Sequence, residues 1–370
     1  MKPSLARLTL RGFKTIRELK DFELGRLTLL IGPNGAGKTN FLSFFRMLSR
    51  MLTPPGELQL YTAEQGGATA LMHVGAFKAA EVEATMTLPS DLGTDEYGFR
   101  LFRAADDSFR FSSEWYRYTK AGVERPLVEF EKGRPEAQLI GESEGGNGTT
   151  RRILRTLRGI RVHHFHDTSA GAHIRNKWPV EDALWLKEDG ANLAPFLYRQ
   201  QESEPKYYRR IVETLRLILP FFADFELAPE HGHLLLRWRE RGSSDRVFGA
   251  SQAADGMLRL MALVALLQQQ ETNLPDVLIL DEPELGLHPY AIEVLAALLQ
   301  SASVHTQVIV ATQSVSVIDR FEPHDIVVVD RSGSESTFRR LNDAALAEWR
   351  ERYTMSELWE KNVLGGRPQR

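Results

Sequence analysis

The feature that constrains this chain most is the segment GPNGAGKTN at residues 32–40. It fits the pattern G-x-x-x-x-G-K-[ST] at every fixed position, and it lies between an apolar run at 27–31 and helically spaced apolar residues at 41–52. Glycines let the backbone wrap around an anion, so that amide N–H groups and a helix start face it. We therefore predict a strand, a phosphate-binding loop and a helix, with Lys38 reaching the β- and γ-phosphates of a nucleotide and the Thr39 hydroxyl holding Mg²⁺. The residues expected to contact the nucleotide are Gly32, Pro33, Asn34, Gly35, Ala36, Gly37, Lys38, Thr39 and Asn40.

Composition limits what else the chain can be. It has 370 residues, which gives room for two or three domains, with 42% hydrophobic and 26% charged residues as in ordinary globular proteins. A net charge of −3 argues against a uniformly basic surface, and the lack of cysteine excludes disulfides, thiolate catalysis and cysteine-bound zinc. The longest apolar run, 260–267, is too short to span a bilayer, and no signal peptide is evident. We expect a cytoplasmic protein without a membrane partner.

The pattern of apolar residues changes along the chain. Short alternating runs between 68 and 140 predict antiparallel strands, and a glycine-rich stretch at 141–149 predicts a flexible loop. Helical spacing dominates 182–201 and 205–222. Regular structure is expected to loosen over 48–67, with a break at Pro54-Pro55-Gly56. The last third alternates apolar strands with helices, which predicts an α/β layer with buried parallel strands at 277–280, 307–311 and 326–329.

A second motif, VLILDEPE at 277–284, is an apolar run that ends in acidic residues. A buried strand that ends in Asp at the carboxyl edge of a parallel sheet places this carboxylate beside bound phosphates. We predict that Asp281 binds Mg²⁺ and that Glu282 orients and deprotonates the attacking water. The alternative, a solvated strand end, becomes weak once the phosphate loop is considered with it.

About 240 residues separate Lys38 from Asp281, too many for a small GTPase. The chain instead resembles the ABC-type ATPase superfamily, and within it the RecF-, SMC- and OLD-like heads and the AAA-21 group. The resemblance covers almost the whole chain. It is carried by GFK at 12–14, GPNGAGKTN at 32–40, DEPELGLHP at 281–289, ELW at 357–359 and GGRP at 365–368.

The resemblance implies an α/β fold, a P-loop NTPase of the ABC-ATPase head type with two lobes, an antiparallel β arm and a helical insertion. The insertion lacks heptads and cannot form a long coiled coil. No nuclease module is evident after Val329. The expected divisions are an N-terminal ATPase lobe at 1–140, the helical insertion at 141–223, a C-terminal ATPase lobe at 224–345 and a tail at 346–370.

In such heads ATP lies between two protomers, and the second protomer contributes the N-terminus of a signature helix. The family pattern there is close to L-S-D-G-T-L-R, and this chain has AADGMLR at 253–259. Asp255 and Gly256 match and are expected to contact the nucleotide, whereas Ala254 replaces the signature serine. Loss of that hydroxyl contact could cost about 1–3 kcal/mol if the ATP is buried. The alternative is an ordinary helix start.

Three further residues are assigned by the resemblance. Gln313 lies where a switch histidine is common; it can hydrogen-bond a phosphate or a water but cannot carry a proton. Slow or gated hydrolysis is therefore expected. His288 aligns with the D-loop acid and is expected to contact the partner protomer, the alternative being a capped turn. Lys14 is expected to reach the nucleotide, the alternative being an exposed loop lysine.

The function we expect is an ATP-dependent switch with ATP and Mg²⁺ as cofactors. It would form a homodimer or higher homo-oligomer around ATP, hydrolyse ATP with Glu282, and act in a DNA-related process, repair or defence against phage, with DNA and a separate effector protein as further partners. The alternative is a non-hydrolysing scaffold or sensor that holds a partner protein, which Ala254 and Gln313 favour. A transporter subunit is disfavoured because the signature L-S-G-G-Q is missing.

Three other features stay open. Arginines recur at helical spacing in 151–158 and form either a phosphate-binding stripe or, as we favour, a solvated helix face. His163, His164 and His166 lie on or after a strand, and alternation splits them across two faces, which disfavours a metal site. Trp238, between Arg237 and Arg239, is expected to point inward from a strand, the alternative being a stacking platform.

Overall fold

The computed structural model describes residues 4–53, 57–73, 81–120, 122–242 and 246–365. The expected break at 54–56, and residues 366–368 of the GGRP motif, lie outside the described residues. Within those ranges no helix combines the length and the apolar character needed to cross a bilayer.

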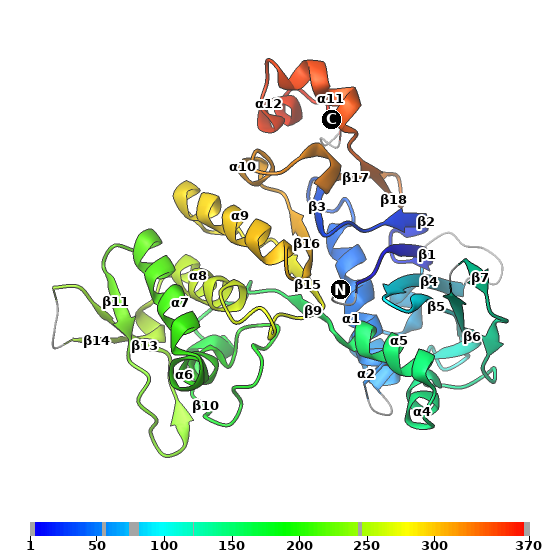
Figure 1. Cartoon of the computed structure of the whole chain (residues 1–370), viewed down its shortest axis with the longest axis horizontal. Coiled ribbons are helices and arrows are strands. Elements are labelled where there is room, and N and C mark those ends of the chain that lie inside the picture. The colour runs from blue at the N-terminus through cyan, green and yellow to red at the C-terminus, as the bar shows by residue number, and fades with distance from the viewer. Residues whose placement is uncertain (1–3, 54–56, 74–80, 121, 243–245, 366–370) are drawn as a thin grey trace.

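A six-stranded sheet lies at the centre of the molecule, with strand order β18-β17-β3-β16-β15-β9 (Figure 1). All neighbouring pairs are parallel except β17 with β18, which form an antiparallel hairpin at one edge. The continuous apolar runs of the sequence become its central strands because both faces of a parallel sheet are covered. The strands are β3 (Leu27–Ile31), β9 (Ile160–His163), β15 (Val277–Asp281), β16 (Gln307–Thr312), β17 (Ile326–Ser332) and β18 (Glu335–Arg340).

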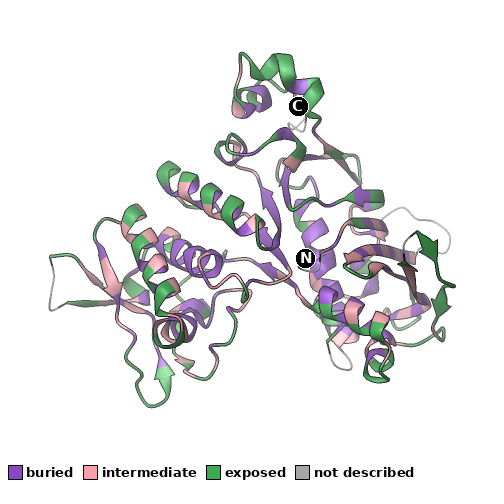
Figure 2. Cartoon of the chain, in the orientation of Figure 1, coloured by how far each residue is buried: buried purple, intermediate pink, exposed green. Residues whose placement is uncertain are grey.

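This sheet separates two hydrophobic cores, because alternate side chains on each strand point to opposite faces. On β3, Leu30 joins the core that contains α1, whereas Leu29 and Ile31 join the core that contains α8 and α9. The central strands β3, β15 and β16 are accordingly buried, as is much of α1 and of α8 (Figure 2). The helices in direct contact with the sheet include α1 (Lys38–Met51) and α9 (Pro289–Ser303), and α8 (Asp255–Leu267) packs against α9.

On the α1 side lies a seven-stranded antiparallel sheet, at the right of Figure 1. Its strand order is β2-β1-β4-β5-β6-β7, with β8 also paired to β6, and the antiparallel strands predicted between 82 and 130 are confirmed. Phe13 meets Phe44 of α1 edge to face, with ring centroids 5.9 Å apart. The strands are β1 (Arg7–Phe13), β2 (Ile16–Glu23), β4 (Glu81–Ser90), β5 (Gly93–Arg103), β6 (Phe109–Lys120), β7 (Val123–Glu124) and β8 (Val128–Glu129).

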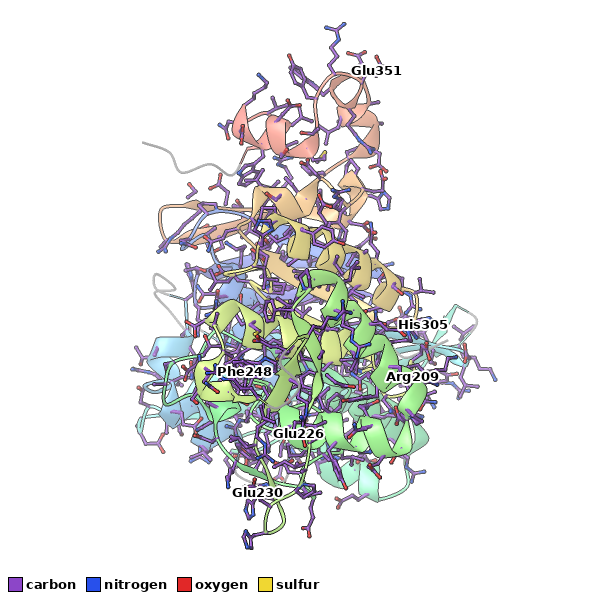
Figure 3. The ribbon with its side chains drawn as sticks, turned by 90° about the vertical axis from the view of Figure 1, so that its left-hand side faces the viewer. Arg209, Glu226, Glu230, Phe248, His305 and Glu351 are labelled. Atoms are coloured by element: carbon purple, nitrogen blue, oxygen red, sulfur yellow. The ribbon has the colours of Figure 1, made fainter. Side chains whose placement is uncertain are left out.

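The second lobe, at the left of Figure 1, contains α6, α7, α8 and two small sheets. Figure 3 views this lobe face on, with Arg209 on α7 and Phe248 on β14 turned towards the viewer. Its elements besides α8 are α6 (Leu193–Ser203), α7 (Pro205–Ile218), β10 (Trp178–Pro179), β11 (Phe222–Phe225), β12 (His233–Leu234), β13 (Arg237–Glu240) and β14 (Val247–Gly249), with the 3₁₀ turns η1 (His173–Arg175) and η2 (Ala250–Gln252).

The helix predicted over 182–201 is wrong in its first half, because residues 182–192 are irregular and α6 begins only at Leu193. The buried side chain of Asn192 replaces the helical hydrogen bonds there. Its Oδ1 accepts the N–H of Lys187 at 2.8 Å, and its Nδ2 donates to the carbonyls of Asp182 and Trp185. One amide side chain thus satisfies the backbone of a loop.

Three other expectations need correction. Residues 48–67 were expected to loosen, but α1 continues to Met51 and α2 (Glu57–Glu64) follows the undescribed residues. The loop expected at 141–149 begins inside α4 (Leu139–Glu144), whose first N–H groups bind the buried Glu114 carboxylate. The helix expected over 205–222 ends at Ile218, just before Pro220, which disfavours helical geometry in the residue that precedes it.

The remaining elements lie at the periphery. The arginines at helical spacing in 151–158 lie on a helix, α5 (Gly148–Arg158), and the tail contains two helices that were not expected (top of Figure 1). Residues 141–223, expected to be a helical insertion, also include β9 of the central sheet, and the proposed domain divisions stay a prediction. The other elements are α3 (Ala68–Leu71), α10 (Val315–Ile318), η3 (Pro323–Asp325), α11 (Asp343–Arg350) and α12 (Met355–Glu360).

The buried side chain of Gln307, 1% exposed, fastens the N-terminal segment to β16. It accepts the N–H of Leu5 at 2.8 Å and donates to the carbonyls of Leu5, Leu24 and Gly25. Buried backbone groups that lose their partners pay the full cost of desolvation. We predict that Gln307→Leu lowers the free energy of unfolding by about 3 kcal/mol.

Urea denaturation measures this effect, and Gln65→Leu is the matched control because Gln65 is exposed at the end of α2. The control should change stability by less than about 0.5 kcal/mol. Equal stability of the two variants would contradict the role assigned to Gln307.

Candidate functional site

The phosphate loop joins β3 to α1 at the carboxyl edge of the parallel sheet, and two of its glycines are required by close contacts. A Cβ on Gly32 would lie 2.1 Å from the carbonyl oxygen of Val329 on β17, so only glycine fits. Gly37 has φ = 115°, and a Cβ there would lie 2.0 Å from Ser336 Oγ. The loop is therefore pressed against the β17–β18 hairpin, and α1 starts directly after Gly37.

Polar contacts from distant elements hold the same loop. The Ser336 hydroxyl on β18 lies 2.6 Å from the Ala36 carbonyl oxygen and 2.7 Å from Thr15 Oγ1. Asn40, expected to contact the nucleotide, donates its Nδ2–H to Thr15 Oγ1 at 2.8 Å. Arg331 donates to the carbonyl of Gly35 at 3.2 Å. Sequence reasoning missed these supports, because no local pattern reveals that β18 and the β1–β2 turn meet the loop.

The Lys38 side chain is buried, with 4% exposure, and folds back over the loop. Its ammonium donates to the carbonyl oxygens of Gly32 at 2.6 Å and Pro33 at 3.1 Å. Burial lowers the pKa of Lys38, while the charges of Glu282, Asp281 and Glu284 oppose that shift. The lysine predicted from the first motif is thus close to the acids predicted from the second. Asn34, Gly35 and Thr39 are exposed at the mouth of the loop.

Asp281 ends β15 and is 7% exposed. Burial raises its pKa, and the positive charges of His166, Arg46 and Lys38 counteract this rise. Its Oδ2 lies 3.9 Å from Arg46 Nη2, and its Oδ1 is buried without a hydrogen-bond partner. A buried carboxylate oxygen with no donor is costly, so this atom is suited to a ligand or an ordered water.

Glu282 has φ = 42°, a left-handed conformation that is strained for a residue with a side chain. Its N–H donates to the Ala311 carbonyl at 2.7 Å, and Gln313 Nε2 donates to its Oε2 at 3.2 Å. The structure therefore brings together Glu282 and Gln313, two residues singled out from separate motifs. Neighbouring Glu284 is buried and accepts the Thr312 hydroxyl at 2.5 Å, a support that sequence reasoning did not anticipate.

These residues fit Mg²⁺ bound together with a nucleotide. Mg²⁺ commonly keeps several waters and binds through one or two carboxylates plus substrate phosphates. Asp281 offers one unpartnered carboxylate oxygen, and Thr39 an exposed hydroxyl. In the described part of the chain, no three His, Asp or Glu side chains converge into a metal site, so a cage built by protein ligands alone does not fit.

The segment 253–259 forms the start of α8 and is fastened to the motif at 281–289. A Cβ on Gly256 would lie 2.4 Å from the Gly286 carbonyl oxygen, so the helix start packs directly on that turn. Arg259 donates to the carbonyls of Leu285, Phe165 and His166.

Asp255 is exposed and pairs with Arg175 at 3.0 Å. Over the ranges that the structure describes, no hydrogen bond or ion pair connects 253–259 with the loop at 32–40 of the same chain. The start of α8 instead contacts the turn at 285–286, Phe165 and Arg175. The structure does not join Asp255 and Gly256 to the rest of the predicted nucleotide site within one chain.

The two remaining candidates differ in setting. His288 is exposed and caps α9, because its Nδ1 accepts the N–H of Tyr290 at 3.4 Å, which agrees with the capped turn weighed as its alternative. Lys14 has φ = 46° and is half-buried beside α1. Burial and then the charge of Arg46 lower the pKa of Lys14. Lys14 is therefore not an exposed loop lysine. It lies within the electrostatic influence of Arg46 on α1, near the candidate site.

Arg46 is the functional candidate that sequence reasoning missed. It lies eight residues after Lys38, two turns along α1, and therefore shares a helix face with Lys38. That spacing was a signal available from the sequence. Its charge affects the pKa values of Lys14, His164, Glu188 and Asp281, so it lies among ionisable groups from four different segments.

Two of the features that the sequence left open, the arginines of 151–158 and Trp238, have structural roles. In α5, Arg152 pairs with the buried Asp95 at 2.8 Å and Arg158 donates to the Leu52 carbonyl, which leaves only part of the predicted arginine stripe on the surface. Trp238 is buried and stacks on Phe248 with ring centroids 5.9 Å apart, as expected of an inward strand residue.

The buried His163 at the end of β9 makes stability depend on pH. Burial lowers the pKa of His163 to about 4, whereas 6.5 applies to the unfolded chain. As the pH falls from 6.5 towards 4 the unfolded state binds a proton that the folded state excludes, so stability is lost over this window. His163 alone should account for about 3 kcal/mol of this loss.

We predict that His163→Leu flattens the dependence of unfolding free energy on pH between 6.5 and 4.5, measured by urea denaturation at several pH values. The change in slope is the relevant quantity, because the substitution also leaves the Lys187 carbonyl without its partner at every pH. The control is His305→Leu at an exposed position (Figure 3). Parallel profiles for the wild type and His163→Leu would contradict the prediction.

Comparisons with known proteins agree with this geometry. The structure is similar to the SMC head bound to the C-terminal winged-helix domain of ScpA, with a TM-score of 0.61 and 16% identity over 93% of this chain and 99% of that one. It is also similar to the Pyrococcus furiosus SMC head with an extended coiled coil bound to the C-terminal domain of ScpA, with a TM-score of 0.57, 13% identity, and 94% and 99% coverage. The SMC head of Pyrococcus yayanosii gives a TM-score of 0.52, 13% identity and the same coverages.

At these identities the similarity shows the fold alone, and the predicted α/β ABC-type head fold is confirmed. None of the curated proteins matches the sequence significantly. Residues 27–319, more than half of the chain and including both motifs, match the family described as "AAA domain, putative AbiEii toxin, Type IV TA system". The chain therefore belongs to this family of P-loop ATPases.

Proposed function

We propose that the protein binds ATP with Mg²⁺ and hydrolyses it. The observation that carries this proposal is the meeting of two distant motifs at one sheet edge. Lys38 lies within the electrostatic influence of Asp281 and Glu282, although about 240 residues separate them in sequence. Phosphoryl transfer to water requires a cation for the phosphates, a carboxylate for Mg²⁺ and a base for the water. Lys38 is the cation, Asp281 has the unpartnered carboxylate oxygen, and Glu282, held by Gln313, is the base.

In this proposal the loop at 32–40 binds the phosphates through its backbone N–H groups and the N-terminus of α1. Lys38 leaves the carbonyls of Gly32 and Pro33 and turns to the β- and γ-phosphates. Thr39 and Asp281 hold Mg²⁺, which neutralises charge on the phosphates when bound. Glu282 accepts a proton from the attacking water, and Gln313 holds the Glu282 carboxylate in place.

We further propose that a second copy completes the site with its Asp255 and Gly256, with His288 at the contact between protomers. The separation of α8 from the loop of its own chain supports an action in trans. A helix start offers N–H groups to the γ-phosphate even without the serine hydroxyl. In this assembly Lys14 lies near the bound nucleotide, on the Arg46 side.

The biological setting we propose is a switch in a DNA-related process, repair or defence against phage, with a separate effector. The family description, which names a putative toxin, and the ScpA partner of the similar SMC heads support a role that acts through another protein. DNA binding, the effector and a cytoplasmic location stay predictions.

A second candidate is a scaffold that binds ATP without turnover. Ala254 in the signature position and Gln313 beside Glu282 favour it, because neither side chain can supply the hydroxyl or the titratable group found in related heads. Both candidates require ATP binding, so the comparison below separates them by turnover.

The test is ATP hydrolysis by the wild type and by Glu282→Gln, each with and without double-stranded DNA. Removal of the general base should lower turnover by about 10²–10⁴-fold while ATP binding persists. The matched control is Glu348→Gln on α11, an exposed glutamate, which should hydrolyse ATP at the wild-type rate.

Turnover that rises with DNA would support the DNA-related switch, and turnover that ignores DNA would redirect attention to a protein partner. Tight ATP binding with no turnover above that of Glu282→Gln would refute hydrolysis and favour the scaffold.

The proposed dimer generates a separate prediction. Ala254→Ser restores a hydroxyl at the N-cap of α8, where it could donate to the γ-phosphate of the other protomer. We predict that ATP-dependent dimerisation of the Glu282→Gln protein strengthens by about 1–3 kcal/mol with this change, measured by sedimentation. A monomeric protein in both backgrounds at saturating ATP would refute the dimer.

A further inference from the structure

The guanidinium of Arg46 is held in the protein without the hydrogen bonds that it normally requires. Its side chain is 23% exposed, and both Nε and Nη2 are buried with no acceptor. Arginine stays charged in proteins and carries five N–H donors. Burying guanidinium N–H groups without hydrogen-bond acceptors therefore costs free energy. Groups of this kind in folded proteins call for an explanation, such as a ligand or a second conformation.

Arg46 faces one carboxylate of the proposed nucleotide site without hydrogen-bonding to it. Its Nη2 lies 3.9 Å from Asp281 Oδ2, which is within ion-pair range but beyond a hydrogen bond. The Oδ1 atom of the same carboxylate has no partner. The two groups attract each other while neither is satisfied.

A second carboxylate beside Arg46 comes from the irregular segment 182–192. Burial raises the pKa of Glu188, and the charge of Arg46 is the strongest influence that opposes this rise. The carbonyl of Glu188 accepts the N–H of His164 at 2.8 Å, so this segment is attached to the end of β9. Through His164, the segment that carries Glu188 is thus attached at the strand end next to Asp281, the carboxylate that Arg46 approaches.

The strand register explains why these groups converge. Ile279 of β15 lies opposite Val162 of β9, and both side chains face the core that contains α1. Two residues further along, Asp281 and His164 continue on that face, beside α1 and Arg46. His164 Nδ1 is also buried without a partner. Unpartnered polar atoms from α1, β15 and the end of β9 therefore gather in one place.

We propose that Arg46 is a positioning residue shared by Asp281 and Glu188, and that it couples the binding of Mg²⁺ and ATP to the segment 182–192. The inference rests on the proposed function. Once Asp281 ligates Mg²⁺, its carboxylate no longer attracts Arg46, and Glu188 becomes the remaining carboxylate beside the guanidinium. Arg46 then pairs with Glu188 and tightens the segment against β9.

Other molecules can contact the segment 182–192, because part of its surface is apolar and exposed. Leu184 and Trp185 are exposed large apolar side chains, and Arg161 lies over the Trp185 ring at 5.5 Å. Trp185 and the four residues after it, Glu188 among them, line a pocket of about 380 Å³ together with His164. A shift of Glu188 therefore alters the wall of a surface pocket far from the loop in sequence.

The test is amide hydrogen exchange of the full-length protein with a non-hydrolysable ATP analogue, in EDTA and in Mg²⁺. In the wild type, Mg²⁺ should slow exchange in 182–192 by about fivefold or more relative to EDTA. Arg46→Met should abolish this difference while the analogue still binds, as measured by calorimetry. Glu188→Gln should abolish it too, and the double variant should show no further loss.

Arg209→Met on the exposed face of α7 is the control and should respond as the wild type does (Figure 3). Glu188→Gln keeps the test valid if Arg46→Met unfolds, since it removes only a charge. Mg²⁺-dependent protection that survives in either variant would overturn the coupling, and so would loss of analogue binding in Arg46→Met, which would make Arg46 a nucleotide contact. Failure of the wild type to bind the analogue would instead refute the proposed function, and this inference with it.

Discussion

The contact between the Gly32 backbone and the Val329 carbonyl is the constraint on which the site depends. No side chain fits between them, so the phosphate loop lies directly on β17 as it leaves β3. The β17–β18 hairpin then carries Ser336 to the other end of the loop, where Gly37 leaves room for its hydroxyl. The loop is shaped by strands that follow it by about 300 residues, which explains why the chain needs its full α/β layer to build a nine-residue motif.

The parallel sheet has a second consequence. Because β3, β15 and β16 end at the same edge, the loop, the Asp281–Glu282 pair and Gln313 meet without any sequence proximity. The left-handed conformation of Glu282 shows that the fold accepts local strain to direct this carboxylate. On the same face, Arg46 and Asp281 have buried polar atoms without hydrogen-bond partners, so the electrostatics of the site favour additional ligands.

Local pattern was sufficient to predict the phosphate loop, the strand that ends in Asp281 and the antiparallel strands, because each signal lies within ten or so consecutive residues. The irregular 182–192 segment could not be predicted in this way. Its backbone groups hydrogen-bond to the Asn192 side chain instead of to one another as in a helix. The spacing of apolar residues in the sequence gives no sign of this arrangement. Ser336 and Thr15 were missed since their role arises only when β18 and the β1–β2 turn reach the loop. Arg46 could have been found from its spacing to Lys38, but its lack of partners is visible only in three dimensions.

We propose that the loop at 32–40 binds the phosphates of ATP through Lys38. Calorimetric titration of the wild type and of Lys38→Ala with ATP and Mg²⁺ tests it most directly, with unfolding measured alongside to show that the variant is folded. We expect saturable binding by the wild type that is lost, or weakened by at least about tenfold, in the folded variant. Equal binding by the two proteins, or no binding by the wild type, would contradict it.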